Sequence, residues 1–99
     1  MTGAAGNAAP DTVKRTLAIA NKRGLHARAA AKFVRTAGQF DAAIRVSFKG
    51  QDVSGLSIMG LMMLAAGIGS SIELSCSGRQ ALEAMATLSA LVEGKFGED

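Results

Sequence analysis

Ninety-nine residues with a mass of 10.1 kDa are enough for one domain and leave no room for a second hydrophobic core. Apolar residues make up 48% of the chain, but 19 of those 48 residues are alanine, so the core is expected to be modest. A charged fraction of 19% and a mean hydropathy of +0.24 exclude a chain that is disordered throughout. The single Cys76 excludes a disulfide framework and a multi-thiolate zinc site, which favours a reducing, cytoplasmic location.

The net charge of +3 is unevenly distributed along the chain. No acid lies between Thr12 and Phe40, whereas seven basic residues do: Lys14, Arg15, Lys22, Arg23, Arg28, Lys32 and Arg35. This segment favours an anionic ligand or an acidic partner surface. The alternative is that these side chains only solvate a strand and a helix face.

The two ends of the chain differ in composition. Residues 1–11 are rich in Ala and Gly and lack both a charged start and an apolar stretch, so we expect a flexible N-terminal extension before a domain over residues 12–99. Val53–Ile72 carries no charge, but Gly and Ser interrupt it too often for a helix that crosses a membrane.

The first half of the chain predicts a strand, a helix and a hairpin. Apolar residues alternate in a strand over Thr12–Ala20, and a helix from His26 to about Ala37 buries one stripe at a spacing of three and four residues. Apolar and polar residues alternate again over Ala43–Lys49, which predicts a second strand. Lys49-Gly50 then predicts a tight turn into a short strand, Gln51–Ser54.

The second half predicts a short apolar helix, a strand and a final helix. The short helix spans about Ser57–Ala66, and the strand spans Ser71–Ser77 with Cys76 facing inward. Ser77 is expected to cap the last helix, Arg79–Glu93. We expect its buried stripe to comprise Leu82, Met85, Leu88, Ser89 and Val92.

The resulting order is βαββαβα, which indicates the α+β class. Strands with one apolar face need a cover on that face only, and three amphipathic helices supply it. We therefore predict an open-faced sandwich: one four-stranded, mostly antiparallel sheet with all three helices on one face. The order of the strands in the sheet does not follow from the sequence.

The only histidine, His26, falls where the loop enters the first helix. The first turn of a helix presents unpaired N–H groups and a partial positive charge, which stabilise an anion. A neutral imidazole there is a nucleophile, and Arg28 two positions later would surround a phosphoryl group with further positive charge. Small neighbours such as Ala27 and Ala29 would leave the site unshielded. The alternative is an exposed capping histidine without chemistry.

Ser57 is expected to be the N-cap of the short helix, where a serine oxygen accepts a backbone hydrogen bond. The same position tolerates an added phosphoryl group, because the new charge meets the positive end of the helix. Leu61, Met62, Met63 and Leu64 are mostly expected in the core, whereas Met59 or Met62 would form an exposed docking patch.

Two segments together resemble the HPr family, the phosphocarrier proteins of the bacterial phosphoenolpyruvate-dependent phosphotransferase system. Gly24-Leu25-His26-Ala27-Arg28-Ala29-Ala30 resembles the active-site signature of the family, and Ser57-Ile58-Met59-Gly60-Leu61-Met62-Met63 resembles its regulatory-serine signature. The resemblance runs from about Thr12 to Gly94.

The resemblance implies a carrier rather than an independent enzyme. His26 would take a phosphoryl group on Nδ1 from Enzyme I and pass it to a IIA-type acceptor, and Arg28 would neutralise the transferred group. Ser57 would be the target of an HPr kinase/phosphorylase. No cofactor, metal, nucleic acid or membrane is implied, and a monomer is expected. Docking would use Ala27, Ala30, Ala31, Arg35, Met59 and Met62.

Two other functions are alternatives. The first is a regulatory binding module whose docking to a target protein is switched by its phosphorylation; this is compatible with a carrier. The second is a nucleic-acid binder. It is disfavoured because the only aromatic residues are four phenylalanines, and no platform for stacking bases is evident. The segment Ser57–Ala66 resembles the nitrogen-type and alphaproteobacterial branch of the family more than sugar-transport relatives, so the choice between sugar transport and a regulatory phosphorelay stays open.

Overall fold

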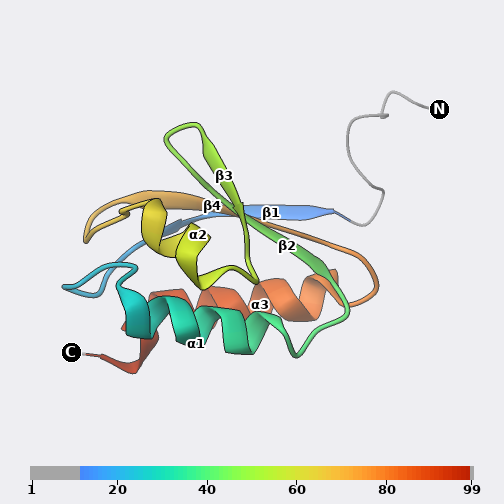
Figure 1. Ribbon diagram of the computed structural model, residues 1–99. Helices are drawn as coiled ribbons and strands as arrows, with labels where there is room; N and C mark the ends of the chain where they lie inside the picture. Colours follow the sequence, from blue (N-terminus) through green and yellow to red (C-terminus); the bar gives the residue numbers. More distant parts are fainter. Residues whose placement is uncertain (1–11, 99) are drawn as a thin grey trace.

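A computed structural model describes residues 12–98 of the chain (Figure 1). The expected N-terminal extension, residues 1–11, lies outside the described residues. The elements follow the predicted order: β1 (Val13–Ala18), α1 (Ala27–Ala37), β2 (Ala43–Phe48), β3 (Gln51–Ser54), α2 (Ile58–Met63), β4 (Ser71–Ser77), α3 (Ala81–Glu93) and a short 3-10 turn, η2 (Lys95–Gly97).

The four strands form one antiparallel sheet in the order β1-β4-β2-β3. Its alternation is the predicted one, because Val46 and Leu74 pair across β2 and β4 and are both fully buried. Thr16 and Glu73 pair on the opposite, open face and are exposed. The three helices lie together on the covered face (Figure 1). The predicted open-faced sandwich is therefore confirmed, and the strand order is new information.

One core fills the space between the sheet and the helices. Each helix contributes a fully buried apolar side chain: Phe33 from α1, Leu61 from α2 and Leu88 from α3. The turn η2 adds Phe96, which is 1% exposed. The segment that follows α3 is thus anchored in the same core that carries α1.

The hairpin between β2 and β3 forms as predicted. Both turn residues have left-handed backbones, with φ of 50° at Lys49 and 82° at Gly50. Two such residues in a two-residue loop match the right-handed twist of the paired strands.

The helix α2 is shorter than the predicted Ser57–Ala66. Ala65 has a φ of 56°, which ends the helical hydrogen bonding after Met63. Leu61 and Leu64 are buried as expected, but Met63 is 71% exposed. The expectation of a core position for Met63 was wrong, because this helix of six residues buries only the side that carries Leu61.

The helix α3 also differs from its predicted start and stripe. Its N-cap is Gln80 rather than Ser77, because Ser77 still belongs to β4 and Gly78, with a φ of 108°, turns the chain before the helix begins. Leu82 is 71% exposed, so its predicted burial was wrong. The stripe is instead Ala81, Ala84, Met85, Leu88, Ser89 and Val92. Within residues 12–98 no helix has the length and apolar character that crossing a membrane requires.

Candidate functional site

The loop between β1 and α1 places His26 at the start of the helix. Gly24 has a φ of 65°, and an added Cβ there would lie 2.5 Å from the carbonyl oxygen of Ala66. This close approach lets the amide of Leu25 donate to the same oxygen at 3.0 Å. His26 follows as the N-cap of α1 in an extended conformation, as the sequence predicts.

The helix end beside His26 keeps its backbone donors. The carbonyl of His26 accepts from the amide of Ala30 at 2.9 Å, which begins the helical ladder. The imidazole makes no capping hydrogen bond to the helix. The first N–H groups of α1 therefore stay available for an anion.

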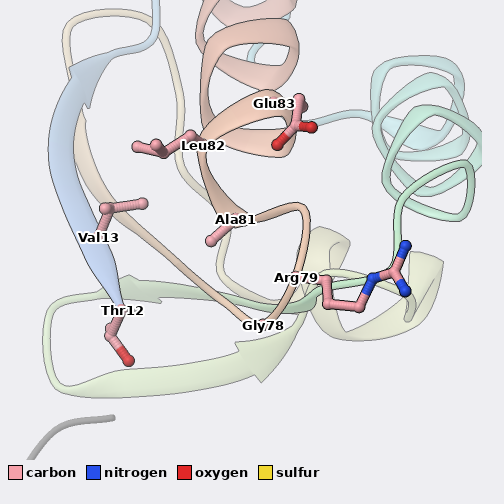
Figure 2. A pocket seen from close by; sticks show the side chains of 7 residues that line it. All are labelled: Thr12, Val13, Gly78, Arg79, Ala81, Leu82 and Glu83. Atoms are coloured by element: carbon pink, nitrogen blue, oxygen red, sulfur yellow. The ribbon is translucent and has the colours of Figure 1, made fainter. Parts of the chain in front are cut away.

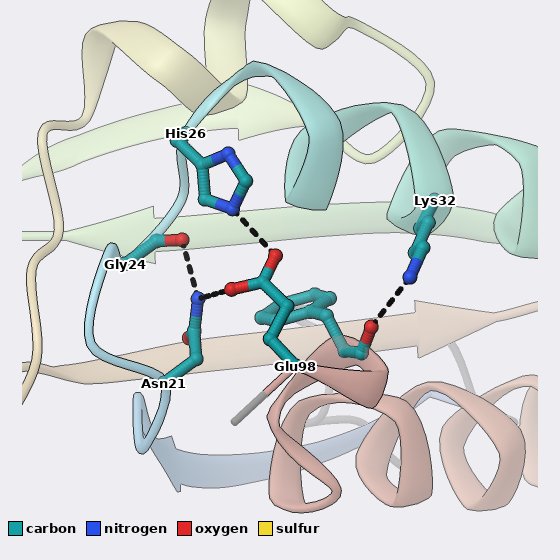
Figure 3. A network of polar contacts seen from close by, with 6 residues as sticks. Asn21, Gly24, His26, Lys32 and Glu98 are labelled. Atoms are coloured by element: carbon teal, nitrogen blue, oxygen red, sulfur yellow. Dashed lines mark hydrogen bonds and ion pairs between the residues drawn. The ribbon is translucent and has the colours of Figure 1, made fainter.

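The imidazole is more enclosed than expected. Only 16% of the His26 side chain is exposed, because Glu98 covers one side of the ring and its Oε2 lies 2.5 Å from Nε2 (Figure 3). The expectation of an unshielded site is thus wrong on this side. Its cause is 72 residues away along the chain, where η2 returns the C-terminal segment to α1, so no local pattern could reveal it.

A buried amide holds the Glu98 carboxylate. The Nδ2 of Asn21 donates to Oε1 of Glu98 at 3.1 Å and to the carbonyl of Gly24 at 2.8 Å, and Asn21 is fully buried (Figure 3). Partial burial raises the pKa of the Glu98 carboxyl, but the Asn21 amide, the His26 ring and the Arg23 charge together lower that pKa below its ordinary value. Glu98 is therefore ionised at neutral pH. Neither Asn21 nor Glu98 was singled out in the sequence.

An open depression of about 230 Å³ adjoins the imidazole, lined by Lys22, Arg23, His26, Arg28 and Glu98. Arg28 is exposed, and across residues 12–98 its guanidinium has no ion-pair partner. The nitrogen Nδ1 lies on the side of the ring away from Glu98 (Figure 3). The depression thus combines a nucleophilic ring, three cations and a helix N-terminus, an arrangement that suits a group with negative charge.

The second predicted position, Ser57, is the N-cap of α2 as expected. Its Oγ accepts from the amide of Gly60 at 2.9 Å, and its side chain is half-buried. This bond satisfies one of the free amides at the start of the helix.

The helix α2 lies beside α1 (Figure 1), and several apolar side chains on and just before α2 are exposed, forming an apolar patch. Met59 is 68% exposed and Met62 is 39% exposed, as the sequence allowed. The patch is larger than predicted, because it also includes Leu56, Ile58 and Met63.

The docking residues expected on α1 separate into two groups. Ala27 and Arg35 are exposed and Ala31 is half-buried. Ala30 is fully buried, so its expected role in docking is wrong. The physical reason is its spacing of three from Phe33 and seven from Ala37, which places all three on the core stripe.

A second depression, of about 280 Å³, lies at the opposite end of β1 (Figure 2). Its lining includes the apolar side chains of Val13 and Leu82 and the charged side chains of Arg79 and Glu83. It contains neither His26 nor Ser57, so it does not belong to the predicted site.

The fold is an open-faced sandwich, and its candidate site is one histidine at a helix start beside an open, basic depression. Residues 13–94 match the family model described as "PTS HPr component phosphorylation site". The chain belongs to the HPr family, the phosphocarrier proteins of the phosphotransferase system.

Named relatives agree with this assignment. The chain is 49% identical over 86 residues to "Phosphocarrier protein HPr" of Cupriavidus necator, a match that covers 87% of this chain and 97% of that protein. It is 42% identical to "Phosphocarrier protein NPr" of Shewanella violacea, with coverage of 87% and 94%. The crystal structure of HPr-C-His from Thermoanaerobacter tengcongensis superposes with a TM-score of 0.84 at 44% identity, covering 88% of this chain and 98% of that one. Membership implies that the protein exchanges phosphoryl groups with partners.

Proposed function

We propose that His26 is the phosphoryl acceptor of this carrier. Its Nδ1 takes the phosphoryl group from a phosphohistidine of Enzyme I and passes it to a IIA-type acceptor, in the cytoplasm and as a monomer. The observation that carries the proposal is the position of His26: it is the N-cap of α1, and it adjoins a basic depression that Arg28 also lines.

Charge neutralisation and alignment account for the chemistry. Transfer between two histidines makes one P–N bond and breaks another, so catalysis consists mainly of alignment and stabilisation of the phosphoryl oxygens. The amides of the first turn of α1 and the guanidinium of Arg28 are the donors for those oxygens.

The direct test is phosphorylation of the His26→Ala variant. With phosphoenolpyruvate and Enzyme I, the unaltered protein is expected to gain one acid-labile phosphate in an intact-mass measurement. The variant should gain none while keeping its far-ultraviolet circular dichroism. Undiminished labelling of the folded variant would refute the assignment of His26.

Arg28 is expected to accelerate transfer without being the acceptor. Arg28→Ala should slow phosphorylation by about 10- to 100-fold, because one hydrogen bond to a charged group contributes about 1.5–3 kcal/mol. Arg45→Ala is the matched control, because Arg45 lies on β2 and pairs with Asp52. Equal rates for the two variants would show that Arg28 is only a surface charge.

We propose Ser57 as a site of regulatory phosphorylation by an HPr kinase/phosphorylase. The support is the resemblance of the segment that follows Ser57 to the regulatory signature, and the helix start at which the new charge would lie. Incubation with the kinase and ATP should add an acid-stable phosphate to the unaltered protein and none to Ser57→Ala. A phosphate on the variant would place the modification elsewhere.

A second function, a regulatory binding module, is supported by the apolar patch on α2. We propose that Met59 and Met62, with Ala27, Ala31 and Arg35 of α1, form the face that partners contact. Met62→Asp is expected to weaken capture of Enzyme I. Leu82→Asp serves as the control, because it adds the same charge at another exposed apolar position. Similar losses in both variants would contradict a specific docking face.

A further inference from the structure

The C-terminal turn delivers one carboxylate to the reactive ring. Lys95, Phe96 and Gly97 all have left-handed backbones, with φ of 60°, 55° and 75°. Non-glycine residues adopt this conformation only at a cost, which the surrounding contacts must offset. Those contacts are the burial of Phe96 and a hydrogen bond from Lys32 Nζ to the Phe96 carbonyl at 2.7 Å.

Both oxygens of that carboxylate have a defined partner. Oε1 of Glu98 accepts from the buried Asn21, whose second amide hydrogen is held by Gly24, and Oε2 faces Nε2 of His26 (Figure 3). Only 18% of the Glu98 side chain is exposed. The carboxylate is thus fixed relative to the ring by protein contacts on each side.

The direction of the hydrogen bond follows from the charge on Glu98. Since the carboxyl is ionised at neutral pH, it has no hydrogen to donate and can only accept. The proton in the contact must therefore sit on Nε2. Attack on phosphorus requires the neutral imidazole, which carries one proton, and with that proton on Nε2 the lone pair of His26 is on Nδ1.

We propose that Glu98 is a positioning residue for phosphoryl transfer at His26: it holds the ring as the Nε2–H tautomer with Nδ1 directed away from the carboxylate, and it stabilises the positive charge that the ring acquires. The inference rests on the proposed role of His26.

The electron count shows where that charge arises. The Nδ1 lone pair forms the new P–N bond, while the bond from phosphorus to the donor breaks and its electron pair leaves with the donor. The proton on Nε2 stays in place, so the His26 ring gains one unit of positive charge, facing Oε2 of Glu98. The hydrogen bond strengthens as transfer proceeds, and only this increase accelerates the step. Onward transfer to the acceptor reverses the change.

The test combines a rate with a tautomer measurement on the full chain. Glu98→Ala removes the carboxylate, and Glu98→Gln keeps the size of the side chain but not its charge. Glu93→Gln is the matched control, because Glu93 pairs with Arg15 instead and its loss alters the net charge equally. Phosphoryl transfer from phosphorylated Enzyme I is followed for each variant, and ¹⁵N–¹H correlations of the ring report which nitrogen of His26 carries the proton.

We expect Glu98→Ala and Glu98→Gln to slow transfer by about three- to tenfold, since only part of the hydrogen-bond energy is specific to the transition state. Glu93→Gln should retain the original rate. The ring should be almost wholly Nε2–H in the unaltered protein and in Glu93→Gln, and a mixture of tautomers in Glu98→Ala.

Two outcomes would overturn the proposal. The first is an unchanged rate and tautomer in Glu98→Ala. The second is faster transfer in that variant, which would mean that the carboxylate mainly repels the incoming phosphoryl group. Either result leaves His26 as the acceptor, whereas failure of the unaltered protein to accept phosphate on His26 would refute the proposed function itself.

Discussion

Replacing Gly24 with alanine should disrupt the loop that positions His26, although the added methyl group lies on a different residue. In Gly24→Ala, the new Cβ would lie 2.5 Å from the Ala66 oxygen and 2.8 Å from the Gly67 Cα. Both are backbone atoms and cannot rotate aside. The loop must therefore separate from residues 66–67, which breaks the hydrogen bond from the Leu25 amide to the Ala66 oxygen.

The cost follows from three contributions. A left-handed alanine costs about 1–2 kcal/mol. The lost hydrogen bond contributes about 1 kcal/mol, and overpacking against backbone about 1–3 kcal/mol. Gly24→Ala should therefore lower the free energy of unfolding by about 3–6 kcal/mol, a large share of the 5–15 kcal/mol typical of a domain.

Gly50→Ala isolates the cost of the left-handed backbone from the cost of the close approach. Gly50 has a φ of 82°, but nothing lies within 4 Å of the position that the new methyl group would take, so this variant should lose only about 1–2 kcal/mol. Urea unfolding followed by circular dichroism measures both variants, and phosphorylation by Enzyme I should slow only in Gly24→Ala. Equal losses of stability in the two variants would refute the argument that the approach of Gly24 to Ala66 builds the site.

Three further predictions concern groups whose contacts are defined. Ser57→Ala should lower the unfolding free energy by about 1 kcal/mol in urea, because the Gly60 amide loses its acceptor; an unchanged midpoint would contradict this. The lowered pKa of Glu98 means that its stabilisation is complete above the ordinary value of 4.5 and is lost as the pH falls through the folded-state value. The stability difference between the unaltered protein and Glu98→Gln should therefore shrink in acid, and a constant difference would refute the contact. Burial raises the pKa of the Cys76 thiol from 9.0 to about 11, so the unfolded thiol ionises first and about 2–3 kcal/mol of stability is lost between pH 9 and 11. Cys76→Ala should lack this loss, and parallel profiles would count against it.

The fold was predictable because its signals are local. Alternation in the strands, helical stripes and the Lys49-Gly50 turn each depend on neighbouring residues, and each appears in the structure. The order β1-β4-β2-β3 depends on contacts between distant segments and could not be predicted. The errors at Ser77 and Leu82 both lie near the start of α3: Ser77 still belongs to β4, the helix begins only at Ala81, and its buried stripe runs through Ala81 and Met85 rather than Leu82.

Only the part of the site that the start of α1 supplies was predictable from the sequence. The position of His26 at a helix start and the cation at Arg28 follow from adjacent residues. Its covered side depends on Glu98, which reaches the ring only because η2 adopts three left-handed residues in succession. Left-handed Lys95 and Phe96 are contrary to residue preference. Tertiary contacts override that preference, so no local sequence pattern could predict this turn or the position of Glu98.

The contacts around His26 orient the ring that we propose as the phosphoryl acceptor. Three segments hold it: the Ala66 carbonyl supports the loop before it, α1 begins directly after it, and Glu98 fixes the far nitrogen. Each support comes from a different part of the chain, so the ring is oriented before a partner arrives. Preorganisation of this kind lowers the barrier by removing rearrangement from the transfer step. In the proposed transfer, the side of the ring that bears Nδ1 is left to the partner, whose docking would supply the phosphoryl group and exclude water.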